Sequence, residues 1–570
     1  MNKSKITRSA ACLLGLQLLI FSCQSPEPQQ ESKRGLIAEN AMVVSAREEA
    51  SKIGVEIMQK GGNAFDAMMA TEMALAVTFP FAGNLGGGGF AVFRMANGET
   101  GSIDYREKAP GAAHRDMYLD ENGNVIPELS TKGALASGVP GTIAGIFEAQ
   151  AKYGKLDPKE VLQPVIDLAR NGFVVSPQQA DRLAGIRDVV REVNGEETFY
   201  GKEWNAGDTI KNLALAETLE RIAKNGRDEF YKGETGHRLV AHLRDMGGII
   251  TEEDLEAYEA VWREPVIFNY KELRVISMAP PSSGGVTIGQ ILKMVEPFDL
   301  KSMGHNSAEY VQVLTEAMRR AYADRNYYLG DPDFVDIPVN ELLDREYLKS
   351  RMESFNPDLA TRSSDIAEGS VLFAESMETT HYSIMDSDGN ALAVTTTLNG
   401  AYGSKVYLDE LGFFMNNEMD DFSSKAGVPN MFGLIGAEAN SIAPGKRMLS
   451  SMTPTLVERD GKLWMIVGTP GGSTIITAVA QTILNAYEFD MTMQEAVEAP
   501  RFHHQWLPDQ VLFEENTLDS TLLQILTAKK YLINEGRTPI IGSVDAIMVL
   551  PDGKLEGGAD PRRENKAAGY

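Results

Sequence analysis

Apolar residues recur at helical spacing in two neighbouring stretches near the start of the chain. In residues 45–58, and again in residues 64–77, they return every three or four positions, which is the period of one face of an α-helix. Gly61 and Gly62 interrupt the pattern between the two stretches. The sequence therefore predicts two helices that form a hairpin.

The rest of the chain alternates between helical and strand-like patterns. Residues 306–328 have a helical period, whereas residues 273–278 and 463–467 are short apolar runs typical of strands. Neither a long linker nor an internal repeat divides the sequence. We expect one compact α/β unit.

A β-hairpin is predicted in residues 379–397. Residues 379–386 and 391–397 have the composition of strands, and Asp388-Gly389 between them is a strong signal for a two-residue turn. The register of the two strands follows from the position of this turn.

The predicted register gathers polar side chains around Thr379. Thr397 would lie opposite Thr380, and the next polar residue, Asn399, opposite Glu378. Because side chains alternate with a period of two, Thr397 and Asn399 would point to the same face of the sheet, diagonally beside Thr379.

Composition and charge narrow the class of protein. Hydrophobic residues make up 43% of the chain and charged residues 24%, which is typical of a folded domain. The formal net charge is −26, and such a surface repels phosphate backbones. We therefore expect no nucleic-acid partner.

The N-terminus has the pattern of an export signal. Three basic residues precede an apolar run, residues 10–21, that is too short to cross a bilayer. We assign residues 1–22 to a signal peptide and residues 23–34, which are polar and include prolines, to a tether. Cys23 follows a small residue as in a lipoprotein signal, although Phe21 departs from that pattern. The alternatives are a lipid anchor at Cys23 and simple cleavage, so the expected location is the periplasm or a membrane-anchored lipoprotein.

Several kinds of catalytic centre have no support in the sequence. The two cysteines, Cys12 and Cys23, lie in the signal or at its edge, so the mature chain has no cysteine pair for a disulfide or zinc site. None of the seven histidines has a metal-ligand spacing such as HExxH, and no GxSxG motif is present. His381, His503 and His504 are expected to have structural roles.

A run of four glycines, residues 86–89, precedes a strand-like segment. Glycines permit close approach of the backbone to another element or to a ligand. The sequence leaves both interpretations open, because the run lacks the spacing of a phosphate-binding loop.

A series of motifs resembles the γ-glutamyltranspeptidase family, and it extends over nearly the whole chain after the tether. The motifs are DYRE at 104–107, GVPG at 138–141, PPSSGG at 280–285, TTHYS at 379–383, TLN at 397–399, NNEMDDF at 416–422, LSSM at 449–452, GTPGGS at 468–473 and APRFHHQWLP at 499–508. The resemblance implies an αββα sandwich of the N-terminal-nucleophile hydrolases. It also implies a precursor that cuts itself into a large subunit, residues 35–378, and a small subunit, residues 379–570.

In this family the residue that begins the small subunit is the nucleophile, which implies that role for Thr379. An α-amino group has a pKa of about 7.7–8.0, so the freed amine of Thr379 could act as general base for its own hydroxyl. Thr397 matches the family threonine that hydrogen-bonds the nucleophile. Gly471 and Gly472 follow a strand and precede a predicted helix, where their N–H groups suit an oxyanion hole.

The resemblance also implies a binding site for an amino-acid zwitterion. Arg106, Ser450 and Ser451 would hold the α-carboxylate of a γ-glutamyl group, because guanidinium and hydroxyl donors suit that anion. Asp421, Glu418 and Asn399 would hold the α-ammonium. In the segment that corresponds to the lid loop of bacterial relatives, Phe432 replaces an expected tyrosine and leaves the balance of hydrolysis and transfer open.

The expected function is that of a γ-glutamyltransferase and glutathione hydrolase without a cofactor. Its partners would be glutathione and other γ-glutamyl compounds as donors, and water, amino acids or peptides as acceptors. Two alternatives remain: a related acylase acting on glutaryl amides or poly-γ-glutamate, and an inactive lipoprotein that binds peptides.

Overall fold

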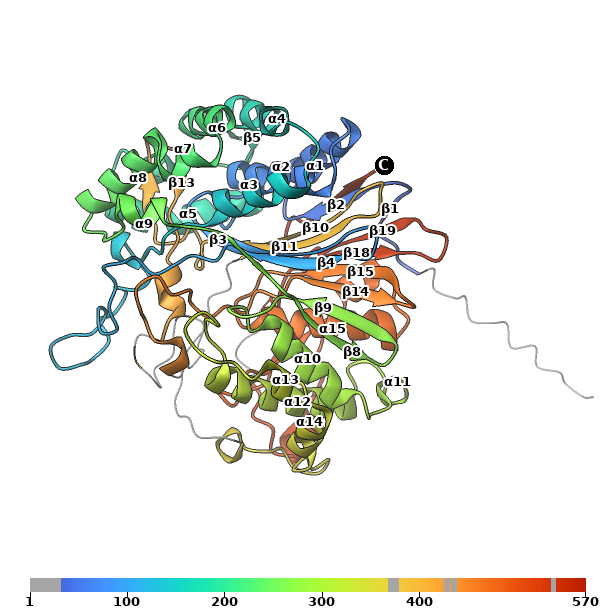
Figure 1. Cartoon of the computed structure of the whole chain (residues 1–570). Helices are drawn as coiled ribbons and strands as arrows, with labels where there is room; N and C mark the ends of the chain where they lie inside the picture. The colour runs from blue at the N-terminus through green and yellow to red at the C-terminus, as the bar shows by residue number, and fades with distance from the viewer. Residues whose placement is uncertain (1–31, 367–378, 424, 426–430, 432–437, 535–539) are drawn as a thin grey trace, which may run out of the picture.

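The fold consists of two stacked β-sheets between two layers of helices (Figure 1). The computed structural model describes residues 32–366, 379–423, 425, 431, 438–534 and 540–570. The predicted signal peptide, Cys23, Glu378 and Phe432 lie outside these residues. Among the residues that the structure describes, we find no helix with the length and apolar character needed to cross a membrane.

Each large sheet has, among the described residues, seven antiparallel strands and mixes strands from before and after Thr379. The first, in spatial order, contains β1 (Leu36–Ala38), β19 (Leu555–Ala559), β18 (Asp545–Val549), β15 (Lys462–Gly468), β14 (Thr455–Arg459), β9 (Leu273–Ser277) and β8 (Val266–Tyr270). The second contains β20 (Lys566–Gly569), β2 (Met42–Ser45), β10 (Thr380–Met385), β11 (Ala391–Thr397), β3 (Gly88–Arg94), β4 (Thr100–Asp104) and β7 (Val261–Arg263). The parts of the chain on either side of Thr379 are therefore interleaved in both sheets.

Within the part of the chain that the structure describes, nine helices lie on the side of the second sheet (Figure 1). They are α1 (Glu48–Gln59), α2 (Ala64–Thr78), α3 (Thr142–Tyr153), α4 (Pro158–Asn171), α5 (Pro177–Asn194), α6 (Leu213–Asn225), α7 (Arg227–Tyr231), α8 (Glu234–Asp245) and α9 (Glu252–Glu256). The helices on the side of the first sheet are α10 (Gly284–Val295), α11 (Leu300–Met303), α12 (Ala308–Tyr328), α13 (Val339–Leu342), α14 (Arg345–Met352), α15 (Thr474–Glu488), α16 (Met493–Glu498) and α17 (Ser520–Ala528). This arrangement confirms the predicted αββα class.

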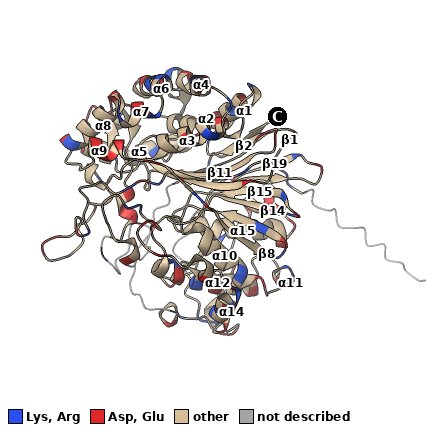
Figure 2. Cartoon of the chain, in the orientation of Figure 1, with Lys and Arg blue, Asp and Glu red and all other residues tan. Residues whose placement is uncertain are grey.

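Three two-stranded sheets complete the fold of the described residues. They pair β5 (Phe173–Val174) with β6 (Thr209–Ile210), β12 (Tyr407–Leu408) with β13 (Phe413–Phe414), and β16 (Phe502–His503) with β17 (Leu512–Phe513). Charged side chains gather on the outer helices and loops, whereas the central strands carry few of them (Figure 2).

The predicted helical hairpin is present as α1 and α2. Gly61, with a φ of +99°, ends the first helix, because glycine adopts this conformation without steric cost. Asn63 caps α2 by accepting from the N–H of Asp66, whose carboxylate accepts from the Asn63 N–H in return. Every residue of α2 is buried because the helix lies between the sheet and the outer helices.

The β10–β11 hairpin is present, but its predicted register is wrong by one residue. Thr380 pairs with Thr396, and not with Thr397. The cause is the turn, which has three residues between Asp386 and Asn390 and places Gly389 at a φ of +91°. The Asp386 carboxylate fixes this longer turn by accepting from the N–H groups of residues 388 and 390.

The glycine run at the start of β3 has a packing role. A Cβ at Gly87 would lie 2.0 Å from the Thr397 carbonyl oxygen, and one at Gly88 would lie 2.5 Å from that of Tyr105. The side chain of Asn84, just before the run, donates to the same Thr397 carbonyl at 2.9 Å. The run thus lets β3 lie directly against the end of β11 and against the residues that precede Arg106.

Candidate active site

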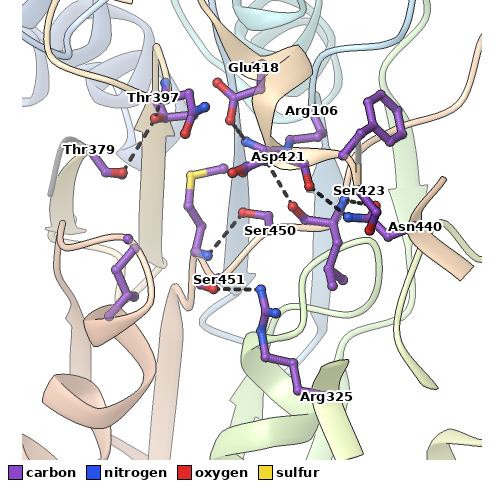
Figure 3. Close-up of a pocket in the computed structure, with 16 residues that line it drawn as sticks. Arg106, Arg325, Thr379, Thr397, Glu418, Asp421, Ser423, Asn440, Ser450 and Ser451 are labelled. Atoms are coloured by element: carbon purple, nitrogen blue, oxygen red, sulfur yellow. Dashed lines mark hydrogen bonds and ion pairs between the residues drawn. The ribbon is translucent and has the colours of Figure 1, made fainter. Parts of the chain in front are cut away.

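Nine of the ten site residues predicted from the sequence line one cavity (Figure 3). They are Arg106, Thr379, Thr397, Asn399, Glu418, Asp421, Ser450, Ser451 and Gly472. Gly471 immediately precedes the last of these and does not itself line the cavity. The cavity is also lined by Arg325, Phe422, Ser423, Asn440, Leu449, Met452 and Ile475.

Thr379 and Thr397 face each other across the end of the hairpin. The observed register, continued by one pair, places Thr397 directly opposite Thr379, and their hydroxyl oxygens are 3.4 Å apart. The Thr397 hydroxyl also accepts from the N–H of Asn399 at 2.8 Å, which fixes its position. Thr379 is only 4% exposed. The pair therefore lies at the end of the hairpin and borders the cavity.

The side chains of β10 alternate between two environments, which explains the direction of Thr379. The Tyr382 hydroxyl reaches toward α2 and donates to Glu72 at 2.7 Å. His381 and Ser383 point the other way, and the Ser383 hydroxyl donates to the Asp545 carbonyl of the facing sheet at 3.0 Å. Thr379 has the parity of His381, so its side chain belongs to the layer between the sheets.

Arg106 is held by two carboxylates on the opposite side of the cavity. The guanidinium donates to Glu418, and to Asp421 at 2.5 Å, both in a 3₁₀ turn, Glu418–Asp421. It also donates to the carbonyls of Met448 at 3.4 Å and Leu449 at 3.2 Å. The sequence predicts that Arg106 and the acids bind different parts of a ligand, and in the structure they also pair with each other.

A third acid, Glu107, makes this cluster more negative than one arginine can balance. Glu107 is fully buried, and its carboxylate lies 3.8 Å from the Arg106 guanidinium and against Glu418. Burial raises the pKa of Glu107 to about 7 and that of Asp421 to about 6, although Arg106 opposes both shifts. Burial also raises the pKa of Glu418 well above its usual range. An added cation would allow these acids to ionise.

The Ser450-Ser451 pair offers hydroxyl hydrogens to the cavity. The Ser450 oxygen accepts from the N–H of Met452 at 3.1 Å, and the Ser451 oxygen accepts from Arg325 at 2.9 Å. A hydroxyl has a single hydrogen, and within the described part of the chain neither hydroxyl has an acceptor for it. Two such donors side by side suit an anionic ligand.

Gly471 and Gly472 form the turn between β15 and α15. Their φ values are +141° and +55°, which glycine adopts without strain. The residue at the helix start, Ser473, does not cap the helix and instead donates to the side chain of Gln505 at 2.6 Å. Gly472 and Ile475 line the cavity, so the positive end of the α15 dipole lies beside it.

The three histidines in the family motifs, His381, His503 and His504, are buried and have structural contacts. The His381 ring contacts the hydroxyls of Thr395 and Ser383, and burial lowers its pKa to about 3, so it is neutral. His503 contacts the Thr477 hydroxyl at 2.8 Å, and His504 contacts Asp509 at 3.2 Å. None of them is among the described residues that line the cavity.

Three polar residues of the cavity, Arg325, Ser423 and Asn440, were not predicted from the sequence. Asn440 donates to the Asp421 carbonyl at 2.7 Å and accepts from the N–H of Leu449 at 3.0 Å, so it joins the acidic turn to the serine segment. Arg325 lies on α12 within a helical run that is buried along nearly its whole length. The sequence signal for Arg325 was only a charged residue in a buried helix, which does not indicate a cavity.

Comparison with known proteins agrees with this geometry. The family model for gamma-glutamyltranspeptidase matches residues 50–570. A glutathione hydrolase proenzyme of Escherichia coli K12 is 47% identical over 540 residues, which cover 94% of this chain and 92% of the relative.

Two solved structures extend the comparison to the fold. A cephalosporin acylase from Bacillus halodurans has a TM-score of 0.83 at 25% identity and covers 97% of this chain and 99% of its own. A γ-glutamyltranspeptidase from Helicobacter pylori has a TM-score of 0.56 at 40% identity and covers 61% of this chain and 99% of its own. With a family model that spans most of its length and a relative of this identity, the chain belongs to the γ-glutamyltranspeptidase family.

Proposed function

We propose that this protein is a self-processing γ-glutamyltransferase and glutathione hydrolase. It cleaves γ-glutamyl amides such as glutathione through an ester of Thr379 and passes the γ-glutamyl group to water, an amino acid or a peptide. The observation that carries this proposal is a single buried cavity that joins Thr379 to a cluster of charges suited to an amino-acid zwitterion. Membership of the family supports it.

Maturation frees the general base. The Thr379 hydroxyl attacks the carbonyl of Glu378, the peptide nitrogen leaves as the α-amine of Thr379, and water then hydrolyses the resulting ester. The products are a large subunit, residues 35–378, and a small subunit, residues 379–570. Interleaving of strands from both parts in each sheet would keep the subunits together after the cut.

Catalysis then proceeds in two steps. The Thr379 amine takes the proton of its own hydroxyl, and the oxygen attacks the γ-carbonyl carbon of the donor. The N–H groups of Gly471 and Gly472 stabilise the oxyanion, and the tetrahedral intermediate expels the amine product with the proton. Water or an acceptor amine attacks the ester in the second step. Thr397 holds the nucleophile in position through the contact between the two hydroxyls.

Recognition of the donor uses the charged side of the cavity. The α-carboxylate binds to Arg106 and to the hydroxyls of Ser450 and Ser451, and the α-ammonium binds to Asp421, Glu418 and Asn399. Binding of the ammonium favours ionisation of the closely spaced carboxyl groups around Asp421. Binding of the carboxylate supplies an acceptor for the hydroxyl hydrogens of Ser450 and Ser451. No step needs a cofactor.

The related acylase remains the second candidate, since the Bacillus halodurans structure carries that name. A glutaryl amide lacks the α-ammonium, and would leave Asp421 and Glu418 without a cation other than Arg106. The buried acids therefore favour a γ-glutamyl donor. An inactive peptide-binding lipoprotein is the third candidate, and it would leave the chain uncut.

Export is a further part of the proposal, based on the first 23 residues alone. The signal peptide, residues 1–22, would direct the chain to the periplasm, and a lipid at Cys23 would anchor it through the tether, residues 23–34. Mass spectrometry of the protein from membrane and soluble fractions tests this point, because a lipidated Cys23 adds the mass of the acyl chains.

The decisive experiment follows the new N-terminus and the substrate preference together. Wild-type protein should give two bands on a denaturing gel, with Thr379 as the first residue of the smaller one by mass spectrometry. It should hydrolyse γ-glutamyl-p-nitroanilide faster than glutaryl-p-nitroanilide. An uncut chain would refute the proposed mechanism, and a preference for the glutaryl amide would favour the acylase.

A further inference from the structure

Arg325 is a buried cation with no carboxylate partner among the described residues. It is 3% exposed, lies near the C-terminal end of α12 and borders the active-site cavity. Its guanidinium donates to the hydroxyls of Ser283 and Ser451, each at 2.9 Å, and to the side-chain oxygen of Asn326 at 2.9 Å. All of these acceptors are neutral.

The other cation of the cavity is bound differently. The Nε, Nη1 and Nη2 atoms of Arg106 all have acceptors, and two of these acceptors are the carboxylates of Glu418 and Asp421. Arg325 uses three of its five N–H groups, and two have no acceptor within the described part of the chain. The cavity thus combines a neutralised arginine with one whose charge is not balanced by contact with an anion.

Burial of an unpaired charge is costly, which makes this arrangement informative. Transfer of an ion out of water costs several kcal/mol even after the protein relaxes, so buried charges are usually paired. Burial lowers the pKa of Arg325 to about 10, and the guanidinium therefore stays charged at neutral pH. A positive group kept in this state beside a cavity favours an anionic ligand.

Arg325 also orients the serine pair (Figure 3). A guanidinium only donates hydrogen bonds, so the Ser451 oxygen must accept and its hydrogen remains for a ligand. Through Ser283 the same arginine reaches Ser450, because the Ser283 hydroxyl accepts from Arg325 and donates to the Ser450 carbonyl at 2.7 Å. One side chain thus holds both serines in place.

We propose that Arg325 is a second cationic anchor for the α-carboxylate of the donor, acting directly and through the Ser451 hydroxyl. This inference rests on the proposed function, since it assigns a partner to the carboxylate of a γ-glutamyl group. The carboxylate lies between Arg106 and Arg325, while the ammonium lies against Asp421 and Glu418. Each charge of the zwitterion then has a counter-charge.

Three p-nitroanilides separate the contributions of the two charges. The γ-glutamyl compound carries both the carboxylate and the ammonium, the glutaryl compound carries only the carboxylate, and the 4-aminobutanoyl compound carries only the ammonium. We expect Arg325→Met to lower kcat/KM for the γ-glutamyl and glutaryl compounds about 10- to 100-fold relative to the 4-aminobutanoyl compound, mainly through KM. Arg325→Lys keeps the positive charge but loses the planar guanidinium that donates two parallel hydrogen bonds. This variant should therefore show a smaller loss than Arg325→Met.

Arg320 supplies a matched control on the same helix. It is also buried, but it pairs with Glu316 and does not line the cavity. Arg320→Met should lower stability while the ratios between substrates stay within about twofold of the parent, since its head group has no contact with the site. A purely structural role for Arg325 would affect all three substrates equally, and that result would overturn the proposal.

A binding measurement separates failure of this inference from failure of the proposed function. Calorimetry should show that Arg325→Met weakens binding of L-glutamate about 10- to 100-fold more than binding of 4-aminobutanoate, which lacks the α-carboxylate. This result requires no turnover, so it stands even if the wild type cleaves none of the three amides. If Arg325→Met does not fold, the same comparison is made with Arg325→Lys, and unchanged selectivity in that variant refutes the anchor.

Discussion

The two sides of the cavity consist of different kinds of chemical group. The nucleophile side consists of hydroxyls and backbone groups on strands and at a helix start, namely Thr379, Thr397 and Gly472, and none of these is ionised in the uncut chain. The recognition side consists of buried charges on loops and on a 3₁₀ turn, with Arg106, Glu418 and Asp421 at its centre. The contrast separates the residues that react from those that bind the substrate, so substitutions can test each group in turn.

The largest effect should come from the nucleophile itself. Thr379→Ala removes both the attacking oxygen of maturation and that of catalysis, so we expect an uncut chain and a loss of activity of about 10⁴-fold or more. A denaturing gel and the p-nitroanilide assay measure the two outcomes. Thr380→Ala is the matched control, since that side chain has the opposite parity on β10. Normal cleavage in Thr379→Ala would show that Thr379 is not the nucleophile of maturation.

The next effect should come from the recognition side and should appear mainly in KM. Asp421→Asn removes the carboxylate that pairs with Arg106 and that would bind the ammonium. Loss of such a buried charged contact costs about 2–5 kcal/mol of binding free energy. We expect kcat/KM for γ-glutamyl-p-nitroanilide to fall by roughly 30-fold or more, with maturation intact. Equal losses with the glutaryl compound, which has no ammonium, would contradict the assignment.

Acid should weaken the recognition side as well as the nucleophile side, whose Thr379 amine takes up a proton as the pH falls through about 7.7–8.0. Burial raises the pKa of Asp421 to about 6, so this carboxylate takes up a proton as the pH falls through 6 and can no longer pair with an ammonium. We expect kcat/KM for the γ-glutamyl compound, divided by that for the glutaryl compound, to fall about tenfold per pH unit below this value, since the ionised fraction of Asp421 falls by that factor while both compounds use the same amine.

The pH profile has its own internal control. In Asp421→Asn the position cannot titrate, so the ratio of kcat/KM between the γ-glutamyl and glutaryl compounds should no longer depend on pH between 5 and 7. A profile that keeps the wild-type shape in this variant would assign the titration to another group.

The smallest effect should come from Thr397, which holds the nucleophile but does not react. Thr397→Val keeps the shape and removes a hydroxyl contact of 3.4 Å with Thr379, which costs about 0.5–1.5 kcal/mol. We expect kcat to fall about 3- to 10-fold with little change in KM, as measured by steady-state kinetics. A change in KM alone would place Thr397 on the recognition side.

Much of the nucleophile side could be predicted from the sequence. Strand alternation in residues 379–385 and 391–397, the existence of the hairpin and the helix after Gly472 all follow from local patterns. The resemblance to the family then selected nine residues that the structure brings into one cavity. These features depend on neighbours in the chain, which a sequence displays directly.

The tertiary structure alone decided the remaining features. The register of the hairpin depended on Asp386, whose carboxylate also accepts from the N–H of Ala64 at the start of α2 and so stabilises the longer turn. The contact between Arg325 and Ser451 joins residues 126 positions apart. Local periodicity determines which residues form strands and helices, but the burial that leaves a charge unpaired or raises a pKa arises only when distant segments pack together.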